Sequence, residues 1–183
     1  LIMKVIDWQG IFILLFVLGL LLVAAGFQFR ESLPSAQRLT GPRQPIFKSF
    51  APLFRNQTFV LYLLIQTFAM GVMFSYIASS PFIFQNAYGI SPLGYSLIFG
   101  LNAIGIMCGG LLAPHCGHPE VAVKRGIRGF CTMGIILAGF LIAELSIVWV
   151  ETALFLTLVL MGIILPTSTS LAMDCERERA GKA

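Results

Sequence analysis

The chain has 183 residues, of which 57% are hydrophobic and 11% are charged, and its mean hydropathy is +0.89. A soluble domain of this size cannot shield so many apolar side chains from water, so the composition excludes a water-soluble globular protein and predicts a membrane protein. The net charge of +4 comes from basic residues spread over separate connecting segments, which does not indicate a nucleic-acid-binding surface.

Five apolar runs are long enough to cross a bilayer as helices, because one crossing takes about 20 residues. In chain order, we expect these spans at residues 9–27, 59–84, 93–113, 129–148 and 152–173. Only a short stretch around Trp149 to Glu151 separates the last two, so we expect a tight antiparallel hairpin with its turn there. The predicted fold class is an all-α membrane protein with five transmembrane helices.

The basic residues gather on one side of these spans. If successive spans alternate in direction, eleven of the twelve Lys and Arg residues fall on the same side: Arg30, Arg38, Arg43, Lys48, Arg55, Lys124, Arg125, Arg128, Arg177, Arg179 and Lys182. An excess of Lys and Arg marks cytoplasmic loops. We therefore predict a multi-pass protein of the cell inner membrane, with residues 29–57, 114–128 and 174–183 in the cytoplasm.

The segment 29–57 has a different composition from its surroundings, with four prolines and five basic residues. Such a segment is typical of a linker between packed units. We expect residues 1–28 to be the last helix of an N-terminal bundle, and residues 58–183 to be the first four helices of an incomplete C-terminal bundle. On this interpretation the chain is a fragment of a larger membrane protein whose remainder is missing.

Three short motifs follow one another in the middle of the chain. They are Ser-Pro-Phe at 80–82, Tyr-Gly-Ile-Ser-Pro at 88–92 and Phe-Gly-Leu-Asn at 99–102. In this order they resemble the end of the seventh helix, the following turn and the eighth helix of the Bcr/CflA drug-resistance transporters. That group belongs to the major facilitator superfamily, whose two helical halves are joined by a cytoplasmic linker. By this resemblance, the five spans are the sixth to tenth helices of a partial major facilitator superfamily fold.

The resemblance implies a function for the intact protein, namely a proton-coupled secondary transporter that exports drugs or small apolar metabolites by alternating access. Its partners would be a drug-like small-molecule substrate, protons, the lipid bilayer and the rest of the transporter. No cofactor, metal or nucleic acid is predicted, and no motif of an enzyme is found. Two alternatives stay open: a truncated, inactive membrane protein and a non-transporting scaffold subunit. A scaffold should lack a polar-lined cavity between the second and fifth spans.

The resemblance also implies that the second and fifth spans line the substrate cavity, with their neighbours contributing. In the second span, Gln66, Met70 and Phe74 share one helical face, and Ser75 follows them. Their amide, thioether and aromatic groups suit a pocket for varied apolar molecules. The alternative for Met70 and Phe74 is ordinary packing inside the bundle.

In the third span, Asn102 is a further cavity candidate, although an interhelical hydrogen bond is its commoner use in helix bundles. Gly105 and Gly109, four residues apart, should let another helix backbone approach closely.

In the fifth span, Pro166 should open the helix near the cavity, with Thr167 among the hydroxyl groups that can bond the freed carbonyls. Glu144 lies close to the end of its span. We therefore interpret it as a carboxylate at the membrane surface rather than as a proton carrier.

Overall fold

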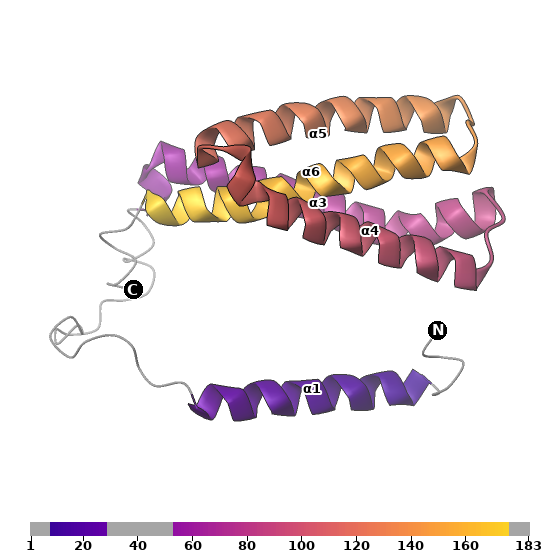
Figure 1. Cartoon of the computed structure of the whole chain (residues 1–183), viewed down its shortest axis with the longest axis horizontal. Helices are drawn as coiled ribbons and strands as arrows, with labels where there is room; N and C mark the ends of the chain where they lie inside the picture. Colours follow the sequence, from indigo (N-terminus) through magenta and orange to yellow (C-terminus); the bar gives the residue numbers. More distant parts are fainter. Residues whose placement is uncertain (1–7, 29–52, 176–183) are drawn as a thin grey trace, which may run out of the picture. The chain divides into compact units, whose positions relative to one another are not determined.

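A computed structural model of the protein describes residues 8–28 and 53–175. The chain forms two compact units, Leu1–Pro42 and Arg43–Ala183. The first unit contains the helix α1 (Trp8–Gln28). The second contains four long helices (Figure 1), which are α3 (Gln57–Pro81), α4 (Pro92–Leu112), α5 (Pro119–Ile142) and α6 (Ile147–Asp174). Most of the predicted linker, residues 29–52, lies outside the described residues.

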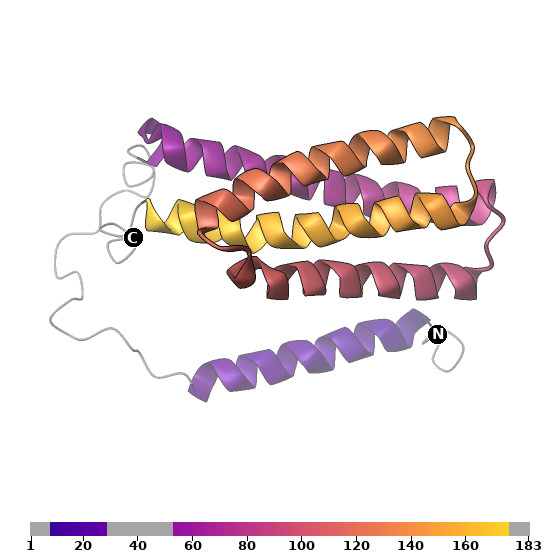
Figure 2. The ribbon, with the colours of Figure 1, turned by 45° about the horizontal axis from the view of Figure 1, so that its top comes forward.

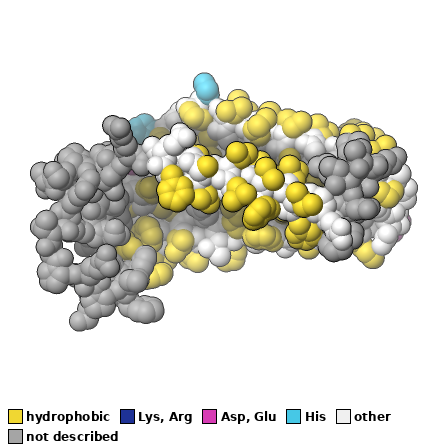
Figure 3. Space-filling view, turned by 90° about the horizontal axis from the view of Figure 1, so that it is seen from below, with side chains coloured by type: hydrophobic (Ala, Val, Ile, Leu, Met, Phe, Trp, Pro, Cys, Tyr) yellow, Lys and Arg dark blue, Asp and Glu magenta, His cyan; other side chains and the backbone are white. Residues whose placement is uncertain are grey.

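Among the described residues, five helices are long and apolar enough to cross a membrane. The prediction of an all-α protein with five membrane-spanning helices is thereby confirmed. Figure 3 shows hydrophobic side chains spread over the described part of one face, with no Lys, Arg, Asp or Glu side chain visible on it. Such a surface suits a hydrocarbon environment.

The ends of α3 and α4 are set by local features of the sequence. The Asn56 side chain caps α3 by accepting hydrogen bonds from the backbone amides of Thr58 and Phe59, at 3.1 and 3.3 Å. After Pro81 the chain continues as a short π-helix, η3 (Phe82–Ala87). Ser91 then caps α4 through a bond from the amide of Gly94, at 3.2 Å. The first three spans therefore lie close to their predicted positions.

Two predicted boundaries are wrong. Helix α5 begins at Pro119 rather than near residue 129, because Pro119 is well placed in a first helical turn and the charged residues that follow continue the helix beyond the apolar run. The hairpin turn does not lie around residues 149–151. The turn lies at Ala143 and Glu144, and α6 has already begun at Ile147, so Glu151 is a helical residue.

Helix α6 lies in the centre of the second unit, where it packs against α3, α4 and α5 (Figure 2). Its buried side chains include Leu158, Met161 and Ile164, each at most 2% exposed. Because α4 and α6 both follow a turn at the same end of the bundle, they run in parallel, while α3 and α5 run the opposite way. The side chains of α6 that face α3, α4 and α5 therefore line the interior of the bundle.

The contact between α4 and α6 is backbone against backbone, as the pair Gly105 and Gly109 predicted. A Cβ atom at Gly109 would collide with the carbonyl oxygen of Val159, and one at Gly162 would collide with that of Ile106. At Gly105, an added Cβ would meet the Phe155 ring at 2.8 Å. The two helices can approach this closely only because these positions lack side chains.

Candidate functional site

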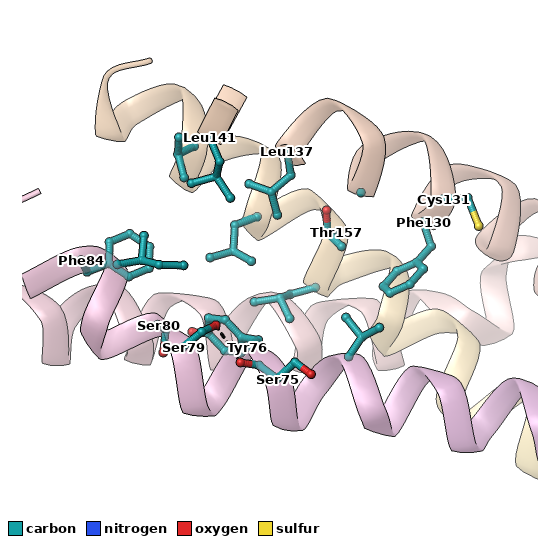
Figure 4. A pocket seen from close by; sticks show the side chains of 16 residues that line it. Ser75, Tyr76, Ser79, Ser80, Phe84, Phe130, Cys131, Leu137, Leu141 and Thr157 are labelled. Carbon is teal, nitrogen blue, oxygen red and sulfur yellow. Dashed lines mark hydrogen bonds between the residues drawn. The ribbon is translucent and has the colours of Figure 1, made fainter. Parts of the chain in front are cut away.

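The other side of α6 borders a partly open cavity of about 360 Å³ that is lined by α3, η3, α5 and α6 (Figure 4). Most of its wall is apolar, with Phe84 at one end and Leu137 and Leu141 contributed by α5. Polar groups come mainly from one stripe of α3, because residues three or four apart share a helical face. These groups are Ser75, Tyr76, Ser79 and Ser80, and Thr157 of α6 lies across from them.

Three of these hydroxyl groups already donate their protons within their own helices. Ser75 donates to the carbonyl of Gly71 at 2.9 Å, Ser79 to that of Ser75 at 2.7 Å, and Thr157 to that of Ala153 at 2.7 Å. A hydroxyl oxygen still offers lone pairs after its proton is used. The cavity therefore presents hydrogen-bond acceptors rather than donors along these positions.

A second polar group adjoins the cavity through Tyr76. The Asn102 side chain, which is 1% exposed, donates from Nδ2 to the Tyr76 hydroxyl at 3.2 Å and to Glu151 Oε2 at 3.4 Å. The three side chains come from α4, α3 and α6. We call them the Tyr76–Asn102–Glu151 cluster.

Aromatic rings hold Tyr76 in place beside the cavity. Its ring stacks on Phe99 with centroids 5.8 Å apart, and Phe99 in turn contacts Tyr95 at 5.9 Å. The Tyr95 hydroxyl is 2.9 Å from the Ser80 hydroxyl, which is 2% exposed. At the same end of the bundle, the Tyr88 hydroxyl donates to the carbonyl of Leu145 at 2.9 Å and so joins the two turns. Packing and hydrogen bonds together fix this end of the site.

Of the four α3 residues predicted to line the substrate cavity, one lies in the wall of the cavity described above and three do not. Ser75 lines the cavity, whereas Gln66 and Met70 are half-buried and are not among its lining residues. The Thr169 hydroxyl is 2.8 Å from Gln66 Oε1 and 2.8 Å from the Leu165 carbonyl, so Gln66 faces α6. Phe74 is 67% exposed on the described bundle. Whether these residues contact a substrate stays a prediction.

Of the candidates in α4 and α6, only Asn102 bonds to another helix of the described bundle. Asn102 makes interhelical hydrogen bonds, the commoner of the two uses weighed from the sequence. Pro166 is exposed, and α6 continues through it as one helix. Thr167 is 7% exposed and donates to the carbonyl of Ile163 at 2.6 Å. Neither residue lines the described cavity.

Glu151 is the functional candidate that the sequence analysis missed. It was placed in the short stretch between the fourth and fifth apolar runs, which was expected to be the turn of a hairpin. Glu144 is the acidic residue that lies in the turn, where it is exposed and has a φ of 50°. A usable signal was present, since the residues directly before Glu151, Ile147 to Val150, are apolar and include no Gly or Pro to mark a turn.

The bundle, the apolar surface and the buried polar groups define a polytopic helical membrane protein. The whole chain, residues 1–183, matches the profile of the Major Facilitator Superfamily, and the chain belongs to that family. It is similar to the uncharacterized MFS-type transporter YdgK of Bacillus subtilis (strain 168), with 26% identity over 181 residues. The alignment covers 97% of this chain and 45% of YdgK, so the chain spans less than half the length of this curated relative. No solved structure matches the chain.

Proposed function

We propose that the protein acts in secondary transport, exporting drug-like or other small apolar molecules in exchange for protons by alternating access. Family membership supports transport rather than catalysis. We also propose that it belongs to the Bcr/CflA group, with α1 and α3 to α6 as the sixth to tenth helices, since the motifs at 80–82, 88–92 and 99–102 carry that resemblance.

The cavity between α3, α5 and α6 is the observation that carries this proposal. A scaffold subunit is expected to lack a polar-lined space between the second and fifth spans. Here Ser75 and Ser79 of α3 and Thr157 of α6 add hydroxyl groups to the otherwise mostly apolar wall of one cavity of about 360 Å³ (Figure 4). This volume lies within the range of small-molecule sites, roughly 300–1,000 Å³.

The chemistry of the cavity favours a particular class of substrate. Its apolar wall suits aromatic or aliphatic groups, and Phe130 of α5 adds an aromatic ring. Because the hydroxyl groups of Ser75, Ser79 and Thr157 offer acceptors, a substrate with a hydrogen-bond donor fits best. Lipophilic amines and cations combine the two properties.

The distribution of basic residues supports an inner-membrane location with cytoplasmic loops. The described cations are Arg55, just before α3, and Lys124, Arg125 and Arg128 in the first half of α5. Because α3 and α5 run in the same direction, these charges lie toward the same end of the bundle. We propose that this end faces the cytoplasm, as the positive-inside rule predicts.

Filling the cavity tests the proposal. An added Cβ at Gly134, which lines the cavity, meets no atom within 4 Å, so Gly134→Leu should occupy the space without a backbone clash. Gly139 of α5 is equally open but lies outside the cavity lining, so Gly139→Leu is the matched control. The complete gene product would be expressed in bacteria that lack their own efflux pumps, and ethidium export followed by fluorescence.

We expect the unaltered protein and Gly139→Leu to export ethidium, and Gly134→Leu to export much less at equal membrane abundance. Equal export by the two leucine variants would contradict the assignment of the cavity. Failure of the unaltered protein to export ethidium would contradict the proposal that lipophilic cations are substrates.

A further inference from the structure

The Tyr76–Asn102–Glu151 cluster contains two buried oxygen atoms that receive no hydrogen bond from the described residues. They are Asn102 Oδ1 and Glu151 Oε1. Both are acceptors, and the amide of Asn102 has already directed its donor group to Tyr76 and to Glu151 Oε2. A buried acceptor without a donor is costly, more so when it carries charge. What the cluster lacks is one hydrogen-bond donor.

The cluster lies deep in the bundle rather than at its end. Asn102 is the eleventh of the 21 residues of α4, at the midpoint of that helix. Glu151 is the fifth of the 28 residues of α6 and is half-buried, and its hydrogen bond from Asn102 places the carboxylate against the middle of α4. In a membrane, this depth is surrounded by hydrocarbon, where an unpaired charge is expensive and an ionisable residue is a functional candidate.

No cation among the described residues neutralises Glu151. From α3 the titratable group that faces the cluster is Tyr76, and α4 contributes the neutral amide of Asn102, with Tyr95 two turns away. On its own helix, Trp149 contacts Phe140 of α5, and neither is titratable. Glu144 lies in the exposed turn before α6. The described Lys and Arg residues lie toward the opposite end of the bundle.

These observations lead us to infer that Glu151 is a proton-binding site of the transporter. A proton from the aqueous phase forms an O–H bond at Oε1, which removes the negative charge and supplies the donor that Asn102 Oδ1 lacks. In the protonated state, Asn102 Nδ2 donates to Glu151 Oε2, and the new O–H group at Oε1 donates to Asn102 Oδ1. Release of the same proton to water reverses the step, and no other bond is made or broken.

Tyr76 connects this proton site to the cavity. Its ring lines the cavity, while its hydroxyl accepts the hydrogen bond from the same Asn102 amide that bonds Glu151. A molecule that enters the cavity and displaces the Tyr76 side chain therefore breaks one hydrogen bond of the Asn102 amide. The same amide bonds the Glu151 carboxylate, so the surroundings of that carboxylate change as well. This inference rests on the proposed transport function for its coupling role, but proton binding itself can be measured without any substrate.

Infrared difference spectroscopy of the complete protein in lipid, recorded between acidic and alkaline pH, tests proton binding directly. A buried carboxylic acid gives a carbonyl band that disappears on ionisation. We expect this band in the unaltered protein and in Glu144→Gln, and its loss in Glu151→Gln. Asn102→Leu should keep the band but move it to higher wavenumber, because the acid loses its amide partner. The inference is overturned if the unaltered protein lacks the band, if Glu151→Gln retains it, or if Asn102→Leu leaves it in place.

Ethidium transport into proteoliposomes then tests coupling, by comparing transport under a pH gradient with exchange at equal pH. We expect Glu151→Gln to exchange ethidium at equal pH, but a pH gradient should not increase its rate of ethidium transport. The gradient should increase the rate for Glu144→Gln as much as for the unaltered protein. A full response of Glu151→Gln to the gradient would overturn the inference and leave the proposed transport intact. Absence of ethidium transport in the unaltered protein would instead contradict the proposed function, and the infrared band would still decide whether Glu151 binds a proton.

Discussion

The two sides of α6 differ in how they contact their neighbours. Toward α4, the contact is made through Gly109 and Gly162, where even a single added carbon atom would strike the opposite backbone. Toward α3 and α5, α6 borders a cavity whose polar groups include Thr157. Close-packed surfaces resist deformation, and cavities leave room for a ligand. The α4–α6 pair is thus a fixed support, and the site lies on the other side of α6.

The largest effect is expected where the support is broken. Gly109→Ala adds a Cβ that collides with the carbonyl of Val159, so α4 and α6 must separate. Because the added atom meets backbone, which cannot rotate aside as a side chain can, the cost should reach the upper end of the usual range for overpacking, about 3 kcal/mol. Thermal unfolding in detergent should show a clearly lowered midpoint for Gly109→Ala. Gly100→Ala, where the added atom meets nothing within 4 Å, should keep or slightly raise the midpoint, because Ala is the better helix former. Equal midpoints for the two variants would refute the close contact.

A smaller effect is expected at the polar cluster, which joins the two sides. Asn102→Leu removes the donor to Tyr76 and to Glu151 Oε2. Leaving a buried polar group without its partner costs about 1–3 kcal/mol.

The double variant Asn102→Leu/Glu151→Leu should be more stable than the sum of its single variants predicts, because neither polar partner is then left alone. The four unfolding midpoints of this double-mutant cycle give the coupling energy. Strictly additive effects would show that the two side chains do not interact.

The smallest effect on stability is expected for Phe74→Ala, since this ring is 67% exposed on the described bundle. Surface substitutions usually change stability by about 0.5 kcal/mol or less. If Phe74 lines the substrate path, as the sequence predicts, the variant should lose ethidium export while its unfolding midpoint stays unchanged. Normal export at normal abundance would remove Phe74 from the site.

The sequence predicted the number and kind of helices because each crossing leaves a long apolar run that is readable without tertiary information. It predicted the close approach at Gly109 for a similar reason, since small residues four apart serve few other purposes in a spanning helix. The start of α5 was misplaced because the helix extends beyond its apolar part as far as Pro119. Hydrophobicity marks what can lie in lipid, and it does not mark where a helix ends.

The site was harder to predict, because its members are distant in sequence. The interhelical hydrogen bond that was weighed for the cavity candidate Asn102 is present, but its partners are 26 and 49 residues away. Helical periodicity relates residues within one helix, and it cannot show which face of α6 meets α4. Glu151 was misread for this reason. It was placed in a turn between two spans, whereas its hydrogen bond from Asn102 lies within the bundle.

The position of α6 against α3 is the claim on which the site depends, and cross-linking tests it most directly. With the native cysteines at 108, 116, 131 and 175 replaced by serine, the pair Gln66→Cys/Thr169→Cys would be treated in membranes with a short bifunctional thiol reagent. The account predicts rapid intramolecular cross-linking, because Gln66 Oε1 lies 2.8 Å from the Thr169 hydroxyl. The pair Phe68→Cys/Thr169→Cys should not cross-link, since Phe68 is 71% exposed on another face of α3. Cross-linking of the second pair but not the first would contradict the account.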